Sequence, residues 1–331
     1  MGFLNSLLLT LIKGLHVIIN NYAVTIIVFT LLIKVAIMPL NLKSRKSTQR
    51  MQLVQPKMKE LQEKYKNDQE KLNQKMQELY RKEGVSPMGG CLPMIVSMFV
   101  LFAMFYALRT FANEQLVTQF LTFYHNPTID PSTLTDSFLW IKNLWMPDTP
   151  FASFMPDAQS LQMVEFDVWN RVSANLAAAG TIPEALNFAD RNAVNAFISE
   201  VVTPFMASEA YAPYVAVVPG LENLSILGII KLTIYKVGNG WFVLPLISIV
   251  SQIFMQKLTM SNQPMQNGQS NMNTMMYVMT FMSLYFCAIY NSAFALYWVI
   301  SNVYAIVEHI AFDRYFKQQD RKAAKAEEVG I

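Results

Sequence analysis

Five stretches of the chain are apolar over a length close to that of a membrane-spanning helix. About 20 mainly apolar residues are needed to cross a hydrocarbon layer of ~30 Å. The stretches comprise residues 21–41, 91–111, 238–258, 272–290 and 293–312. The last two follow each other so closely that they must form a tight helical hairpin. The pattern therefore predicts an all-α polytopic membrane protein with five transmembrane helices.

Residues 1–20 carry a helical hydrophobic repeat ahead of the first span. Apolar residues recur at spacings of three and four, at Leu4, Leu8, Leu11, Leu15 and Ile18. Lys13 and His16 fall elsewhere on the helical wheel, which predicts an amphipathic helix in the membrane interface. A signal peptide is the alternative. Against it, Lys13 follows the apolar run instead of preceding it, and no small-residue cleavage site comes before the next span.

Residues 42–87 read as an antiparallel helical hairpin. A heptad stripe runs through Met51, Val54, Met58, Leu61 and Tyr65, and it resumes at Leu72, Met76 and Leu79. The polar "KND" at 66–68 separates the two halves, so two helices are expected to share one seam. Such a hairpin is either a solvated coiled coil or a docking arm for a partner such as a ribosome or translocase. Its basic faces could also bind anionic lipid.

The chain between the second and third spans divides into two parts. Residues 112–148 are expected to be an ordered connection resting on the membrane interface, because "FLWIKNLWMPD" is rich in aromatics. Residues 149–237 form an acidic stretch with helical patches separated by prolines, which predicts an external helical cap. Within it, the apolar residues 222–235 are expected to form an additional interfacial helix. A cytoplasmic loop is expected at 259–271.

Composition and charge support the membrane assignment and orient the chain. The sequence is 53% hydrophobic and only 15% charged, whereas soluble domains carry about 25% charged residues. Residues 41–91 contain twelve Lys and Arg against six Asp and Glu, and residues 112–235 contain four against twelve. The tail, 313–331, is basic again. The positive-inside rule therefore places the hairpin and tail in the cytoplasm and the N-terminus outside.

The residues that carry enzyme chemistry are sparse in this sequence. The two cysteines lie near opposite membrane faces and are expected to be small buried residues, without a disulfide. The three histidines do not cluster with acids or cysteines, so no metal site is expected. Nucleophile, nucleotide-binding and metalloprotease motifs do not occur. We therefore expect no enzyme activity, no cofactor and no specific nucleic-acid site.

Lys34 is the only charged residue between Tyr22 and Leu40, inside the first span. A charge at the bilayer centre costs about 2.5–3.5 kcal/mol on insertion scales. Six residues separate Lys34 from Leu40, which is about 9 Å along a helix. The side chain could therefore face a hydrated groove, or it could snorkel to the inner interface.

Three segments of the chain resemble one known family. They are "TLLIKVAIMPL" (30–40), "LVQPKMKELQEKYKNDQEKLNQKMQELYRKEGVSPMGGCLP" (53–93) and "FALYWVISNVYAIVEH" (294–309). Together they resemble the YidC/Oxa family of membrane protein insertases, of which the middle segment is the most specific. The resemblance covers roughly 15–148 and 238–315, and the cap falls outside it. It implies a bacterial inner-membrane protein that guides nascent membrane proteins into the lipid bilayer, alone or with the Sec translocon and the ribosome.

The resemblance also implies a site. In the family, the core helices enclose a hydrated groove, closed on the outside, where a positive charge attracts acidic residues of the client. Lys34 matches the position that is usually arginine; it keeps the charge but lacks the planar fork that grips a carboxylate. The other groove contacts implied are Thr30, Ser97, Tyr297 and Trp298. Ser97 stands where the family often has glutamine, so this wall of the groove is expected to be less polar.

Other interpretations of these residues remain open. Thr30 could be a helix hydroxyl bonded to its own backbone, and Tyr297 and Trp298 could be packing or interface aromatics. Glu308 and His309 are expected at solvated interfacial positions, because a pair between Glu308 and Lys34 would cancel the charge. For the whole chain, a scaffold acting through the hairpin is the alternative function. A small-solute transporter is less favoured because no repeated halves or paired intramembrane charges are evident.

Overall fold

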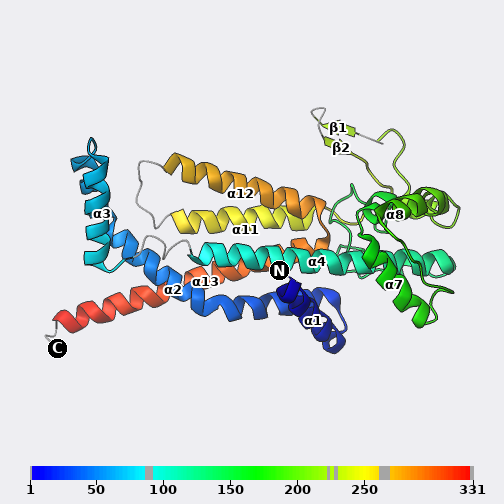
Figure 1. The fold of residues 1–331 in the computed structure, drawn as a ribbon, viewed down its shortest axis with the longest axis horizontal. Helices are drawn as coiled ribbons and strands as arrows, with labels where there is room; N and C mark the ends of the chain where they lie inside the picture. The colour runs from blue at the N-terminus through cyan, green and yellow to red at the C-terminus, as the bar shows by residue number, and fades with distance from the viewer. Residues whose placement is uncertain (1, 86–91, 222–223, 227–229, 261–268, 329–331) are drawn as a thin grey trace.

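The computed structural model describes residues 2–85, 92–221, 224–226, 230–260 and 269–328. Long helices run along an elongated molecule with a helical hairpin at one end and a cap of short elements at the other (Figure 1). The long helices are α1 (Gly2–Ile19), α2 (Tyr22–Lys64), α4 (Leu92–His125), α11 (Val243–Met260), α12 (Gln269–Ile289) and α13 (Ser292–Glu328). By length and composition, α2 over Tyr22–Met51 and α13 over Ser292–Gln319 could each cross a membrane, and α11 and α12 contain shorter apolar runs.

The helix α2 runs without a break from the first apolar stretch into the hairpin. The Asn21 side chain caps its start by accepting a hydrogen bond from Val24 N at 3.0 Å. It ends at Lys64, before the polar "KND", and α3 (Gln69–Glu83) begins behind Asp68, whose carboxylate accepts from Lys71 N at 3.1 Å. Lys57 and Glu83 bridge the two arms at 2.7 Å. The expected boundary at residue 41 is therefore not a break in the helix.

The helix α4 extends well past the second apolar stretch and supports the cap. Its last turns are aromatic, and the cap residues Trp169 and Tyr211 pack on them: Phe120 lies 6.2 Å from Trp169 and Phe123 lies 5.5 Å from Tyr211, measured between ring centroids. The cap is built from α6 (Ala158–Gln162), α7 (Phe166–Ala178), α8 (Arg191–Phe197), η1 (Ile198–Val202), α9 (Thr203–Met206) and α10 (Ala212–Val215). Because these aromatics are buried, the cap is fixed to α4 by a hydrophobic core.

The expected interfacial helix at 222–235 is wrong. The structure has two short strands there, β1 (Leu224–Ile226) and β2 (Ile230–Leu232), paired antiparallel with Ser225 opposite Lys231. This segment is rich in isoleucine, which is β-branched, and it contains Gly228. Both residue types lower the helix propensity of the segment, and isoleucine favours strands, so a strand pair is preferred over a short helix. The fold is therefore helical apart from this pair within the described residues.

The connection after α4, which includes α5 (Pro131–Leu134), ties the long helices together at the cap end. Asn239, fully buried just before α11, donates to the carbonyls of Asn143, Met146 and Pro147 at 2.9–3.0 Å. At the start of α13, the Ser292 hydroxyl donates to Met146 O at 2.7 Å. The Asp148 carboxylate accepts from Leu244 N at 2.7 Å and so caps α11. These bonds fix the starts of α11 and α13 to the connection that follows α4, at one end of the bundle.

One of the two cysteines, Cys287, lies in the part of the chain that the structure describes. Cys287 is a free, fully buried thiol on α12. Cys91 lies outside the described residues.

Candidate functional site

The helices α2 and α13 pack along each other, and α11 packs on another side of α13. Two contacts fix the register between them: Asn41 bonds to Glu308, and the Arg45 guanidinium lies 5.8 Å from the centre of the Phe312 ring. The two helices therefore run in the same direction, with a constant offset in numbering. Since both rise 1.5 Å per residue, the same offset brings Thr30 to about the level of Tyr297, and Lys34 to about the level of Ser301.

Lys34 is half-buried on α2, with no hydrogen bond or ion pair to any residue that the structure describes. The charge of Glu308, on α13, acts on it, but the two side chains form no ion pair. A cation that keeps no fixed partner inside an apolar helix can receive a partner from outside the chain. That property distinguishes Lys34 from a structural charge, which is normally paired when buried.

The remaining residues expected at the site fall into different environments. Thr30 is fully buried and its hydroxyl donates to Ile26 O at 2.6 Å, so it is bonded to its own helix. Tyr297 is 3% exposed and its ring packs 6.1 Å from Phe294. These two residues therefore behave as the packing interpretation expects. The side chain of Ser97 lies outside the described part of the chain.

Trp298 is half-buried and joins a polar cluster between α11 and α13. Its indole Nε1–H donates to Gln252 Oε1 at 3.3 Å, and Asn302 Nδ2 donates to Ser251 Oγ at 3.1 Å. Sequence reasoning did not find Gln252 and Asn302. The available signal was the recurrence of Ser248, Ser251 and Gln252 at helical spacing within an apolar stretch.

A second polar cluster lies where α2 and α13 continue toward the hairpin end. We call Lys34, Asn41 and Arg45 of α2, with Glu308 and His309 of α13, the polar seam. Asn41 Nδ2 donates to both oxygens of Glu308, at 3.2 and 3.1 Å. The Arg45 guanidinium donates to Nδ1 of the buried His309. The expected solvated position of His309 is therefore wrong, because α13 stays packed on α2 beyond the apolar stretch and Arg45 of α2 supplies a partner. Glu308 is half-buried and, as expected, forms no ion pair with Lys34.

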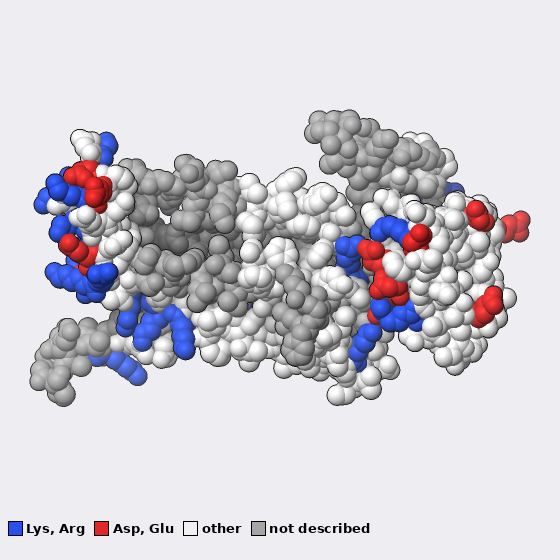
Figure 2. All heavy atoms as spheres, viewed as in Figure 1, with Lys and Arg blue, Asp and Glu red and all other residues white. Residues whose placement is uncertain are grey.

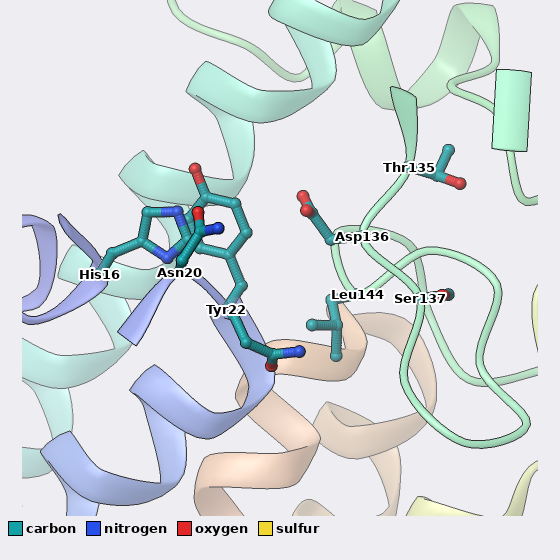
Figure 3. A pocket seen from close by; sticks show the side chains of 8 residues that line it. His16, Asn20, Tyr22, Thr135, Asp136, Ser137 and Leu144 are labelled. Atoms are coloured by element: carbon teal, nitrogen blue, oxygen red, sulfur yellow. The ribbon is translucent and has the colours of Figure 1, made fainter. Parts of the chain in front are cut away.

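A pocket of about 280 Å³ opens near the other end of α2, between α1 and the connection before the cap (Figure 3). The His16 ring stacks on Tyr22 with centroids 3.5 Å apart, and the Asp136 carboxylate faces them and accepts from Trp145 Nε1. Burial lowers the pKa of His16, and the charge of Asp136 partly opposes that shift. Burial raises the pKa of Asp136, which the Trp145 hydrogen bond partly opposes. The pocket therefore lies where α1 meets the connection.

Candidate metal ligands are scattered over the part of the chain that the structure describes. Among the described residues, no group of three or more His, Cys, Asp or Glu side chains converges on one point. The polar seam contains a carboxylate, a guanidinium, an amide, an imidazole and an amine, which together can bind and attract charged groups. The arrangement therefore supports recognition of a charged partner.

Comparison with known proteins identifies the family. Residues 14–320 match the family described as 60Kd inner membrane protein. The membrane protein insertase YidC of Clostridium perfringens is 34% identical over 188 residues, which cover 55% of this chain and 68% of that protein. The corresponding insertase of Chlorobaculum tepidum is 34% identical over 149 residues, or 45% of this chain and 22% of that protein. That of Chlorobium limicola is 37% identical over 147 residues, again 22% of its length.

The matched region contains α2 with Lys34, the hairpin, and the residues that α13 contributes to the polar seam. The chain is thus an integral membrane protein, and it belongs to the 60Kd inner membrane protein family, the YidC/Oxa family that its motifs resemble.

Proposed function

We propose that this protein is a membrane protein insertase that passes nascent membrane proteins from the cytoplasm into the bilayer along the polar faces of α2 and α13. The observation that carries the proposal is Lys34, a half-buried cation in an apolar helix with no partner among the described residues. An acidic residue in the polar tail of a client would supply that partner for a limited time. No bond is made or broken, so no catalytic group is required.

The attraction between Lys34 and a client carboxylate is similar in size to the free-energy cost of moving that carboxylate into the bilayer. Moving an acidic side chain to the bilayer centre costs about 2.5–3.5 kcal/mol on insertion scales. Two opposite charges about 4 Å apart attract by about 4 kcal/mol at an effective dielectric constant of ~20. Attraction to Lys34 could therefore offset most of the cost while the acidic residue crosses. Because lysine holds a carboxylate less firmly than arginine does, release should be rapid.

The orientation we propose has five crossings, at 21–41, 91–111, 238–258, 272–290 and 293–312, with the N-terminus outside and the hairpin and tail in the cytoplasm. Lysine and arginine outnumber acids two to one over 41–91, and acids outnumber them three to one over 112–235. Figure 2 supports this arrangement: on the face shown, the described charged residues gather in two groups, one at the hairpin end and one at and beside the cap, and none of the described residues between the two groups is coloured as charged. In this orientation, the end of the molecule toward which the polar seam lies faces the cytoplasm and the ribosome.

Complementation of bacterial cells depleted of their own insertase tests the role of Lys34. Lys34→Ala is expected to reduce insertion of a client with an acidic tail by tenfold or more, and Lys34→Arg to retain it. Lys43→Ala, at an exposed lysine about two and a half turns further along α2, is the matched control and should be silent. If Lys34→Ala supports insertion as well as the wild type, the charge mechanism is wrong for this chain.

A scaffold that acts through the hairpin is the competing function. Replacing residues 50–82 with a short flexible linker removes that surface and leaves Lys34 in place. If this deletion abolishes activity while Lys34→Ala is silent, the scaffold function is favoured. Crosslinking of a stalled nascent chain to positions 30, 34 and 298 would show the client path directly.

A further inference from the structure

The polar seam contains a built-in competitor for Lys34. The Glu308 carboxylate projects from α13 toward α2, and the charges of Lys34 and Arg45 both act on it. An ion pair between Glu308 and Lys34 would remove the free cation on which client attraction depends. The structure contains no ion pair between these two residues, and the Glu308 carboxylate has a different partner.

Asn41 holds the carboxylate. Its side-chain Nδ2 donates to both oxygens of Glu308, at 3.2 and 3.1 Å. Asn41 lies seven residues beyond Lys34 on α2, which is about 10.5 Å along the helix axis. Seven residues are also close to two full turns, so the two side chains share one helix face. The register of the helices therefore places Glu308 on the face that Lys34 shares but two turns further along, where Asn41 binds its carboxylate.

Arg45 acts in the same direction. It lies one turn beyond Asn41, on the side away from Lys34, and its positive charge acts on Glu308. The guanidinium is itself held in place by its hydrogen bond to His309 and by its position 5.8 Å from the centre of the Phe312 ring. Because arginine remains charged under all physiological conditions, it attracts the carboxylate permanently toward the hairpin end.

We infer that Asn41 is a positioning residue: with the help of Arg45, it restrains Glu308 and so keeps Lys34 free to attract an acidic client residue. This inference rests on the proposed insertase function. A neutral amide suits the role because it binds the carboxylate without placing a further cation between Lys34 and Arg45. In the polar seam, the Lys34 ammonium thus stays free while the Glu308 carboxylate, on the neighbouring helix, stays bound to Asn41.

Loss of the restraint tests the inference. Asn41→Leu keeps the side-chain volume but removes both hydrogen bonds, so Glu308 becomes free to move toward Lys34. Insertion of the acidic client is expected to fall at least fivefold. The double variant Asn41→Leu/Glu308→Gln should recover most of the wild-type insertion, because glutamine cannot neutralise Lys34. A purely structural role for Asn41 predicts no recovery, and that result would overturn the inference.

A second measurement does not depend on activity. A water-soluble carbodiimide joins a carboxylate to an amine only when the two are in contact, with loss of a urea. Mass spectrometry of purified protein in detergent should detect little crosslink between residues 34 and 308 in the wild type, and at least fivefold more in Asn41→Leu. An equal yield in both proteins would contradict the restraint.

The two proposals fail in different ways. If Lys34→Ala is silent in the complementation assay, the proposed function fails, whatever Asn41→Leu does. If Lys34→Ala abolishes insertion while Asn41→Leu preserves it, the insertase mechanism stands and only the restraint by Asn41 is refuted. Lys43→Ala remains the control for general damage to α2.

Discussion

At the scale of single residues, Asp148 joins the external connection to the start of α11. Its fully buried carboxylate accepts hydrogen bonds from Trp140 Nε1, Trp241 N and Leu244 N at 2.7–3.1 Å. The backbone at Gly240 passes so close that a Cβ there would overlap the carboxylate. A side chain from a distant segment thus provides the acceptor that the first N–H groups of a helix need.

Replacing Asp148 should therefore destabilise the protein strongly. Asp148→Ala removes the acceptor of the buried Leu244 N–H and of two partly buried N–H groups, those of Trp140 and Trp241, and a buried donor left without an acceptor costs about 1–3 kcal/mol. We expect a loss of about 2–3 kcal/mol in stability, seen as a lower unfolding temperature of the detergent-solubilised protein. Asp130→Ala, at an exposed cap of the short helix α5, should cost ~1 kcal/mol or less. Equal losses in the two variants would contradict the proposed role of Asp148.

Sequence reasoning found part of the candidate site and missed the rest for a physical reason. Lys34 is conspicuous because a charge in an apolar stretch is costly, so its position alone attracts attention. The sequence presents Glu308 only as a possible partner of Lys34, and Asn41 is unremarkable by composition, because the contact between Asn41 and Glu308 joins positions 267 residues apart. The packing of Thr30 and Tyr297 likewise follows from how the helices pack, which one sequence does not determine.

At the scale of elements, α1 docks on the rest of the protein through a titratable contact. His16 stacks on Tyr22 and faces Asp136 across the pocket of Figure 3. Lys13 adds an ion pair to Glu114 of α4 at 2.8 Å. The folded-state pKa of His16 lies below its ordinary value because burial disfavours the charged ring. Protonation of His16 is therefore easier when α1 is detached.

This contact predicts a pH dependence. Because the pKa of His16 is about 6.5 when exposed and lower when docked, the docked state loses stability as pH falls through that range. The raised pKa of Asp136 acts in a lower range, starting near ~4, where stability decreases as pH rises. Between about pH 7.5 and pH 6 the histidine should dominate, so protease cleavage near residue 20 should become faster on acidification.

Substitutions test whether His16, and not another titrating group, causes this pH dependence. His16→Phe preserves the stacking on Tyr22 but cannot be protonated, so the rate of cleavage near residue 20 should no longer depend on pH in this range. His125→Phe removes an exposed histidine at the end of α4 and should leave the pH dependence unchanged. If the pH dependence persists in His16→Phe, a titrating group other than His16 causes it.

Elements differ in how far the sequence determines them. The polar "KND" interrupts a heptad pattern, and α2 ends just before it, because a break in the apolar seam removes the reason for the helix to continue. The region 222–235 shows the opposite case. Its apolar residues suit either a helix or a strand pair, and short apolar runs do not distinguish the two. The extension of α4 into the cap depends on aromatic contacts with distant residues, which periodicity does not reveal.

At the scale of the whole molecule, the two ends differ in charge and in construction. The hairpin end has a solvated two-helix arm with a basic excess, and the cap end has a compact aromatic core with an acidic excess. Hydrogen bonds join α11 and α13 to the connection at the cap end, and α2 and α13 bond to each other along the polar seam toward the hairpin end. The two ends of the bundle are therefore held by different kinds of contact: main-chain carbonyls and a helix cap at the cap end, and pairs of side chains at the polar seam.

The proposed orientation can be measured by labelling single cysteines. In a background with Cys91→Ser and Cys287→Ser, cysteine would replace Lys66 in the hairpin turn or Ser199 in the cap, both exposed. A membrane-impermeant maleimide added to intact spheroplasts should label position 199 and not position 66, and inverted membrane vesicles should give the reverse. Since Lys and Arg in cytoplasmic loops determine orientation, labelling of position 66 from outside would mean that the excess of twelve basic over six acidic residues in 41–91 does not orient this chain. The polar seam would then open away from the ribosome, and insertion from the cytoplasm through Lys34 would be excluded.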